Sequence, residues 1–343
     1  MTLFDLGSIG SLKLQNRFIR SATAEFVANE DGIVTEKYFQ LYSKLAKGEI
    51  GLIIQGHLYV LDEGKAHDGM AGISQDNHLS SLKQITQLVH EASSGNAIAA
   101  QLNHGGAYSV SIKAPSVRED REVKVMTEDD IENIIIGFQE AALRAKKVGY
   151  DAIQIHSAHG YLLSQFLSNK TNQRKDSWGG SLESRAQLLL SVYNAIRSVV
   201  GINFPVFAKI NGSDDPKKGF TVEESSRVVG WLADEGLDAI EISGMQSIRK
   251  FEIADEAYFS NNARLISRHI GDMPLSVVGG IRTLATMEKL HDEFADFISM
   301  CRPFIREPDL VQKLREGKEK VNCISCDRCY EARNISTCLA KKE

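Results

Sequence analysis

Eight short apolar segments recur along the chain, and each is followed by a longer stretch with helical periodicity. They cover residues 17–22, 51–56, 97–102, 151–155, 206–210, 239–242, 275–278 and 297–300. Because they are short and rich in Ile, Val, Leu, Phe and Ala, they predict buried strands. Strand and helix alternating eight times predict an α/β fold, a (β/α)8 TIM barrel. A doubly wound open sheet shares the alternation, but the count of eight and the lack of G-x-G-x-x-G after the first strand favour the barrel.

Capping signals indicate where the intervening helices begin and end. Thr127 and Asp130 have the spacing of a capping box at the start of a helix over residues 128–148. Gly149 follows that helix, at the position where a left-handed C-terminal cap favours glycine. The same signals surround residues 225–235. We therefore predict helices over both ranges.

Composition narrows the class of protein. The 343 residues are 43% hydrophobic and 25% charged, which is ordinary for a globular protein with a large core. A net charge of −5 and a pI near 6.0 argue against a nucleic-acid partner, since such proteins usually carry a basic stripe. Neither a membrane span nor a signal peptide is visible, so we expect a cytoplasmic protein with no membrane partner. We expect one barrel domain over residues 1–320 and a Cys-rich C-terminal extension over 321–343.

A barrel requires chemistry to collect at the carboxyl ends of its strands. Polar residues or glycines stand at all eight predicted ends, which indicates one shared pocket. They are Ser21 and Thr23, Gln55 to His57, Gln101 to His104, His156 to Tyr161, Lys209 and Asn211, Glu241 and Ser243, Gly279-Gly280, and Cys301-Arg302.

The densest of these ends is His156-Ser157-Ala158-His159-Gly160-Tyr161. Imidazole and phenol can donate a hydrogen bond at neutral pH and can also move a proton. A solvated strand end is the alternative for a single histidine, but three such groups in six residues favour a catalytic role. The i, i+3 spacing of the two histidines could also serve a metal ion, although no nearby carboxylate completes a ligand set.

The last two strand ends suggest that the pocket holds an anionic group. Backbone amides at Gly279-Gly280 can approach a phosphate, and Arg302 can pair with it. A tight turn and a solvated arginine are the alternative interpretation. Across the pocket, Gln101 and Lys209 could bond the polar edge of a flat ring. A positive Lys209 would stabilise electron density developing on that ring, which a flavin requires.

Several dispersed motifs carry a family resemblance over roughly residues 1–315. They are Asn16 to Thr23, Gln101 to Gly106, His156 to Leu163, Gln165 to Ser168, Arg174 to Ser181 and Ser299 to Pro303. With these motifs the chain resembles the old yellow enzyme family of FMN-dependent NAD(P)H oxidoreductases, and in particular the barrel domain of 2,4-dienoyl-CoA reductase. The resemblance implies an ene-reductase that takes a hydride from NADH or NADPH onto FMN and passes it to the β-carbon of an enone or enoyl substrate.

The resemblance also implies a role for each matching residue. Ser21, Ala22 and Thr23 would line the flavin, with Gly56 beneath it, while Gln101 and Lys209 bond the ring's polar edge. The phosphate end would be held by Gly279, Gly280, Cys301 and Arg302. His156 and His159 would bind the substrate carbonyl oxygen, and Tyr161 would donate the proton. The chain departs from many members at Ala24, Ala107 and Lys209, where a cysteine or arginines are common.

The C-terminal extension contains four of the five cysteines. Cys323, Cys326, Cys329 and Cys338 follow the spacing C-x2-C-x2-C-x8-C. Larger relatives that resemble dienoyl-CoA reductase hold a [4Fe–4S] cluster at this place, with a wider spacing. Zinc would suit four thiolates equally, and unligated thiols in a mobile tail are the third interpretation. All three stay open at the level of sequence.

Other functions also remain compatible with the residues alone. One is an FMN-dependent dehydrogenase of an amine-type donor. Another is a flavin-free, metal-dependent barrel hydrolase or lyase that uses His156 and His159 as ligands. The expected partner is a small molecule, and a homo-oligomer is compatible with the sequence.

Overall fold

The computed structural model describes residues 1–215, 217–245, 256–331 and 338–340, and within them it confirms the predicted barrel. Eight strands close in the order β10-β11-β12-β3-β4-β5-β8-β9, and every neighbouring pair is parallel. Their bounds are β3 Phe18–Arg20, β4 Leu52–Tyr59, β5 Ile98–Asn103, β8 Ala152–Ser157, β9 Val206–Asn211, β10 Ile240–Ser243, β11 Leu275–Val278 and β12 Phe297–Met300.

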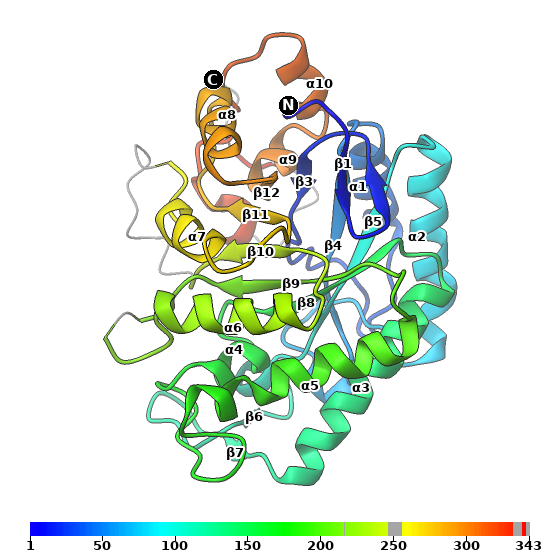
Figure 1. Ribbon diagram of the computed structural model, residues 1–343. Coiled ribbons are helices and arrows are strands. Elements are labelled where there is room, and N and C mark those ends of the chain that lie inside the picture. The colour runs from blue at the N-terminus through cyan, green and yellow to red at the C-terminus, as the bar shows by residue number, and fades with distance from the viewer. Residues whose placement is uncertain (216, 246–255, 332–337, 341–343) are drawn as a thin grey trace.

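Helices surround the barrel (Figure 1). The helices are α1 Glu36–Ala46, α2 Leu79–Ala92, α3 Glu128–Lys147, α4 Leu162–Leu167, α5 Leu182–Val200, α6 Val222–Asp234, α7 Ser260–Ser267, α8 Leu284–Glu293, α9 Arg302–Arg306, α10 Leu310–Arg315 and α11 Arg328–Glu331. The long helices α3 and α5 pack side by side. No helix in the described ranges is long and apolar enough to span a membrane.

The predicted capping residues start and end α3 as expected. Thr127 Oγ1 accepts a hydrogen bond from the Asp130 amide at 3.2 Å, and Asp130 Oδ2 accepts one from the Thr127 amide at 2.9 Å. Gly149 ends the helix with φ at +94°. This backbone conformation suits glycine because a Cβ would be crowded there.

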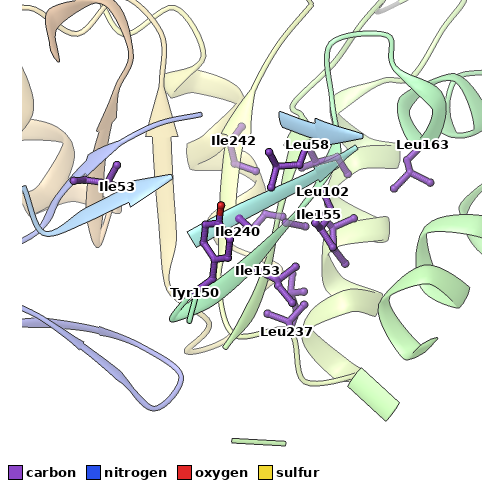
Figure 2. Close-up of a cluster of buried hydrophobic side chains, with 14 of the residues drawn as sticks. Ile53, Leu58, Leu102, Tyr150, Ile153, Ile155, Leu163, Leu237, Ile240 and Ile242 are labelled. Atoms are coloured by element: carbon purple, nitrogen blue, oxygen red, sulfur yellow. The ribbon is translucent and has the colours of Figure 1, made fainter. Parts of the chain in front are cut away.

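Alternation along each strand separates two apolar regions. On β8, Ile153 and Ile155 face the surrounding helices, where they join the large core that Figure 2 shows with Leu58 and Leu102. Ala152 faces the barrel interior and joins a second apolar cluster. Because side chains alternate with period two, the next inward residues on the strands lie one level higher in the barrel. This alternation therefore separates an apolar base from the upper levels of the interior.

A short antiparallel hairpin closes the base of the barrel. Strands β1 (Gly7–Ile9) and β2 (Leu12–Leu14) pair with each other, and Ile9 and Leu14 pack into the inner apolar cluster. This hairpin was not predicted from the sequence, because three-residue strands contain too few residues to establish a period. A second small ribbon, β6 (Lys113–Ala114) with β7 (Lys124–Val125), lies in the segment after β5. Three short 3-10 helices, η1 Asp62–Gly64, η2 Asp76–His78 and η3 Gly106–Tyr108, complete the described elements.

Candidate functional site

A cavity of about 320 Å³ lies at the carboxyl ends of the strands. This is the end at which barrel enzymes place their chemistry, and the volume falls in the usual range for small-molecule sites. Of the thirteen residues expected to bind the cofactor or substrate, eleven line it. They are Ala22, Thr23, Gln101, His156, His159, Tyr161, Lys209, Gly279, Gly280, Cys301 and Arg302.

The other two expected residues, Ser21 and Gly56, lie behind the cavity wall. Ser21 is fully buried, and its Oγ accepts a hydrogen bond from Lys209 Nζ at 2.7 Å. A Cβ on Gly56 would lie 2.0 Å from the carbonyl oxygen of Thr23 and 1.9 Å from Glu25 Oε2. Gly56 is therefore required for packing behind Thr23. Both residues support the wall rather than line it.

Strand β8 and the turn after it bring the two histidines and the tyrosine together. His159 and Gly160 both have positive φ, at +62° and +75°, so the chain turns sharply before α4 begins. The ring centroid of His156 lies 5.1 Å from that of His159 and 5.2 Å from that of Tyr161. The three groups face one another around one small volume, as the sequence predicted.

Burial sets the protonation states of these groups. It lowers the pKa of His159 to about 3, with Lys209 adding to the effect, and lowers that of His156 well below its usual value. Burial raises the pKa of Tyr161 to about 12. At neutral pH the site therefore contains two neutral imidazoles and one protonated phenol, all of which can donate hydrogen bonds.

The tautomer of His156 follows from its hydrogen bond. Its Nδ1 accepts from the backbone amide of Ala158 at 3.3 Å, so the proton of the neutral ring is on Nε2. His159 Nε2 lies 2.8 Å from Ser243 Oγ. Because that hydroxyl can donate to Nε2, His159 can keep its proton on Nδ1.

A third histidine lines the cavity. His57 stands at a β-bulge in β4, where the register with β5 shifts between Gln55 and Leu58. Its ring centroid lies 5.1 Å from Tyr161, and its Nε2 lies 2.9 Å from Nε2 of His67. The sequence placed His57 at a strand end but assigned it no role, since a bulge cannot be read from the apolar pattern.

A connected layer of buried polar groups runs from the cavity wall, at Gln101 and Lys209, to Gln154 and Glu241 behind it. Gln101 Nε2 donates to Gln154 Oε1 at 2.7 Å, and Gln154 Nε2 donates to Glu241 Oε2 at 2.7 Å. Lys209 Nζ lies 3.3 Å from the same carboxylate oxygen, and both side chains of this ion pair are 1% exposed. These inward residues of β5, β8, β9 and β10 lie one level above the apolar base.

The segments that follow β11 and β12 contribute the expected phosphate residues to the cavity. Gly279 and Gly280 have φ values of +127° and +68°, so glycine is required at both positions. Arg302 Nη1 pairs with Asp327, which belongs to the C-terminal segment. Arg282, a buried arginine two residues beyond the glycines, also lines the cavity. Arg282 and Asp327 were not among the predicted site residues, although the run Gly279-Gly280-Ile281-Arg282 contained a signal for the first.

The donor set fits a flavin mononucleotide. Ser299 Oγ is buried in the cavity wall and has no hydrogen-bond partner among the described residues, which a ligand in the cavity would supply. A cation and an amide, Lys209 and Gln101, line the cavity from β9 and β5, and two arginines and two glycines line it from the segments after β11 and β12. A molecule with a polar ring edge and a distant phosphate matches this distribution of charge.

The four C-terminal cysteines lie at and beside the cavity. Cys323 lines it, and Cys329 packs with Ile305 and Cys338. Burial raises the pKa of Cys323 and raises that of Cys329 to about 11. Within the described ranges, no three or more Cys, His, Asp or Glu side chains are arranged to hold a metal ion. The thiols as placed therefore do not form a coordination set for a cluster or for zinc, and a metal role for His156 and His159 gains no support.

Comparison with known proteins agrees with this picture. The sequence model described as NADH:flavin oxidoreductase / NADH oxidase family matches residues 2–321. An NADH oxidase of Thermoanaerobacter brockii is 29% identical over 352 residues, which cover 95% of this chain and 52% of that protein. The chain thus spans about half the length of this relative.

Solved structures show the same likeness. The old yellow enzyme homologue from Zymomonas mobilis has a TM-score of 0.81 at 25% identity, covering 94% of this chain and 95% of that one. Morphinone reductase has a TM-score of 0.80 at 26% identity, covering 94% and 91%. A 2-naphthoyl-CoA reductase complex reaches 0.92 and covers 99% of this chain and 57% of that one, but at 24% identity it shows the fold alone.

The fold, the cavity and these matches together define a (β/α)8-barrel protein of a flavin-dependent class. More closely, the chain belongs to the NADH:flavin oxidoreductase / NADH oxidase family, that of the old yellow enzymes.

Proposed function

We propose that the chain reduces the C=C bond of α,β-unsaturated carbonyl compounds at the expense of NADH or NADPH. The observation that carries the proposal is the grouping of a protonated Tyr161 with neutral His156 and His159 in a cavity that fits FMN. Bound FMN would supply the chemistry of hydride transfer, from NAD(P)H and on to the β-carbon of the substrate.

The side chains supply the polar part of the reaction. His156 Nε2–H and His159 Nδ1–H donate to the carbonyl oxygen and stabilise the negative charge that develops on it as the β-carbon gains a hydride. Tyr161 gives its hydroxyl proton to the α-carbon, so the enolate becomes the saturated carbonyl. The resulting tyrosinate is reprotonated from solvent, which restores the site for the next turnover.

The remaining expected residues are proposed to hold the cofactor. Lys209 and Gln101 would meet the polar edge of the ring, while Ala22 and Thr23 would line its face with Ser21 and Gly56 behind them. At the other end, Gly279, Gly280, Cys301 and Arg302 would hold the phosphate. Arg302 has five N–H donors, of which Asp327 takes up one nitrogen, so others remain for an anion.

The test of this function is spectroscopic. Purified protein should be yellow, should bleach anaerobically with NADH or NADPH, and should recover its colour when cyclohexenone is added. A colourless protein that contains stoichiometric zinc and no flavin would contradict the proposal. Bleaching by NAD(P)H without recovery of colour on addition of any enone would support the flavin site but contradict the proposed ene-reductase activity.

A metal at the C-terminal cysteines is a separate proposal that their spacing supports and their described arrangement does not. Iron, acid-labile sulfide and zinc are to be measured on anaerobically purified protein. Iron and sulfide in equal amounts would establish a cluster, and one zinc per chain would establish a structural zinc site. Absence of all three, with the thiols open to titration, would exclude both metals.

A further inference from the structure

The polar layer at the cavity wall contains one carboxylate, Glu241, which does not line the cavity itself. Its side chain is 1% exposed. A charge buried at this level lowers the free energy of unfolding relative to a well-packed apolar residue. We infer that Glu241 is a positioning residue for the cofactor. It fixes which end of the Gln101 amide faces the cavity and balances the charge of Lys209. This inference rests on the proposed FMN site.

The orientation of Gln101 follows from what each group can donate. An ionised carboxylate only accepts hydrogen bonds, so Gln154 must turn its NH2 group toward Glu241 Oε2, which lies 2.7 Å away. The Gln154 oxygen then faces Gln101, whose Nε2 donates to it at 2.7 Å. The Gln101 oxygen is therefore the atom left to accept a hydrogen bond from the cavity. The Glu241 carboxylate, acting through Gln154, thus determines the orientation of the Gln101 amide, which it does not contact.

Strand register keeps this chain of groups in place. Gln101 on β5 is the direct partner of Gln154 on β8, and Glu241 on β10 is the direct partner of Lys209 on β9. Reversing the Gln154 amide alone would set its oxygen against the carboxylate and its NH2 group against that of Gln101. Two buried hydrogen bonds would be lost, which is the costly case for polar groups shielded from water.

The edge of a flavin ring is selective for this orientation. Its N3–H is a donor that lies between two carbonyl oxygens, so an acceptor is needed opposite N3. The Gln101 oxygen would provide that acceptor when the ring is bound, and the second hydrogen of its amide nitrogen would be free for a ring carbonyl. A reversed Gln101 would place NH2 against N3–H. Glu241 thus favours binding of the N3–H edge of the ring at Gln101, although it does not contact the ring itself.

Glu241 also offsets the positive charge beneath the same edge. Lys209 Nζ lies 3.3 Å from Glu241 Oε2 and donates to Ser21 Oγ at 2.7 Å. An uncompensated buried cation at this place would favour the electron-rich form of the bound ring. The carboxylate reduces that preference, so it lowers the midpoint potential relative to a site with Lys209 alone.

Two variants separate the two effects. Glu241→Gln keeps the volume but removes both the charge and the fixed orientation. Gln154→Met interrupts the hydrogen-bonded chain and leaves the Glu241–Lys209 pair intact. Glu132→Gln on the exposed face of α3 is the matched control, since it removes one carboxylate far from the cavity. Each protein is loaded with 15N-labelled FMN, and the N3–H resonance, FMN affinity and midpoint potential are measured.

We expect the N3–H resonance to move upfield in Glu241→Gln and in Gln154→Met, with about tenfold weaker FMN binding as one hydrogen bond is lost. Only Glu241→Gln should also shift the two-electron equilibrium about tenfold toward reduction, which is about 30 mV. The control should match the wild type in all three. If Glu241→Gln does not fold, Gln154→Met still tests the orientation.

Failure of this inference differs from failure of the proposed function. FMN that binds all four proteins with the same N3–H resonance and potential would overturn the role of Glu241 and leave the flavoenzyme intact. A wild-type protein that binds no FMN would overturn both.

Discussion

Replacing Tyr161 with phenylalanine tests the proposed division of labour most directly. The change removes one hydroxyl and keeps a ring that packs near His57 and His156, at centroid distances of 5.1 and 5.2 Å. Hydride transfer between NAD(P)H and the cofactor needs no proton from this phenol, whereas protonation of the α-carbon does. The variant should therefore be slow in only one of the two half-reactions.

The size of the effect follows from the role assigned to the phenol. A positioned general acid contributes about 10²- to 10⁴-fold, or about 2.7–5.4 kcal/mol of transition-state stabilisation. With its pKa raised to about 12 by burial, only about one Tyr161 in 10⁴ is ionised at pH 8. In the wild type Tyr161 is therefore almost entirely protonated. The rate decrease caused by its loss should be the same across the neutral pH range.

Anaerobic stopped-flow spectroscopy resolves the two steps. Reduction of the bound flavin by NADH or NADPH should proceed in Tyr161→Phe at close to the wild-type rate. Reoxidation by cyclohexenone should slow by about 10²-fold or more, and in the wild type it should stay independent of pH up to about pH 11. Equal slowing of both half-reactions would refute the assignment of Tyr161 as proton donor, because it would indicate a general disturbance of the cavity.

The remaining predictions concern retention, packing and pH. Arg302→Ala should lower the FMN content that survives dialysis, and unchanged retention would contradict its role at the phosphate. Gly56→Ala should destabilise the fold by about 1–3 kcal/mol in urea unfolding because its Cβ overlaps backbone, whereas Gly230→Ala in α6, whose Cβ would meet the His269 carbonyl oxygen at 3.3 Å, should cost clearly less. The hydrogen bond to Asp151 raises the pKa of His90, so this pair stabilises the fold fully below about pH 6.5 and loses its effect as pH rises through the raised value. His90→Gln should therefore lower the urea midpoint at pH 5 and leave it unchanged at pH 9.

The barrel could be predicted because its signals are local and repeated. The predicted bounds of β11 and β12 are those of the structure, and each of the other six strands overlaps its predicted range. A strand buried on both faces is apolar along most of its length, whatever packs against it, so it can be recognised from the sequence alone. The capped helix α3 was equally visible, because its start depends on residues three apart.

The composition of the cavity could be predicted, but not its contacts. Register and strand order bring Lys209 to Glu241 and Gln101 to Gln154, and both strand pairings follow once the barrel is known. The pairing of Arg302 with Asp327 could not be foreseen, because it joins a strand end to the C-terminal segment. The wall position of Gly56 depends on the path of the bulge in β4, which no apolar period encodes.

Buried polar atoms without a hydrogen-bond partner indicate which barrel residues serve a ligand and which serve the fold. Besides Gln55 Nε2 on β4, three atoms of strand residues are buried without a hydrogen-bond partner among the described residues: Asn103 Oδ1, Glu241 Oε1 and Ser299 Oγ. They stand on β5, β10 and β12, in each case on the inward phase of the strand and above the apolar base. Each such atom costs about 1–3 kcal/mol, and the base shows that this chain can fill its barrel with Ala, Ile and Phe where packing alone matters. Ser299 lines the cavity, so its unpartnered hydroxyl is better explained by a polar ligand than by the needs of the fold, whereas Asn103 and Glu241 stand at the same level behind the lining residues.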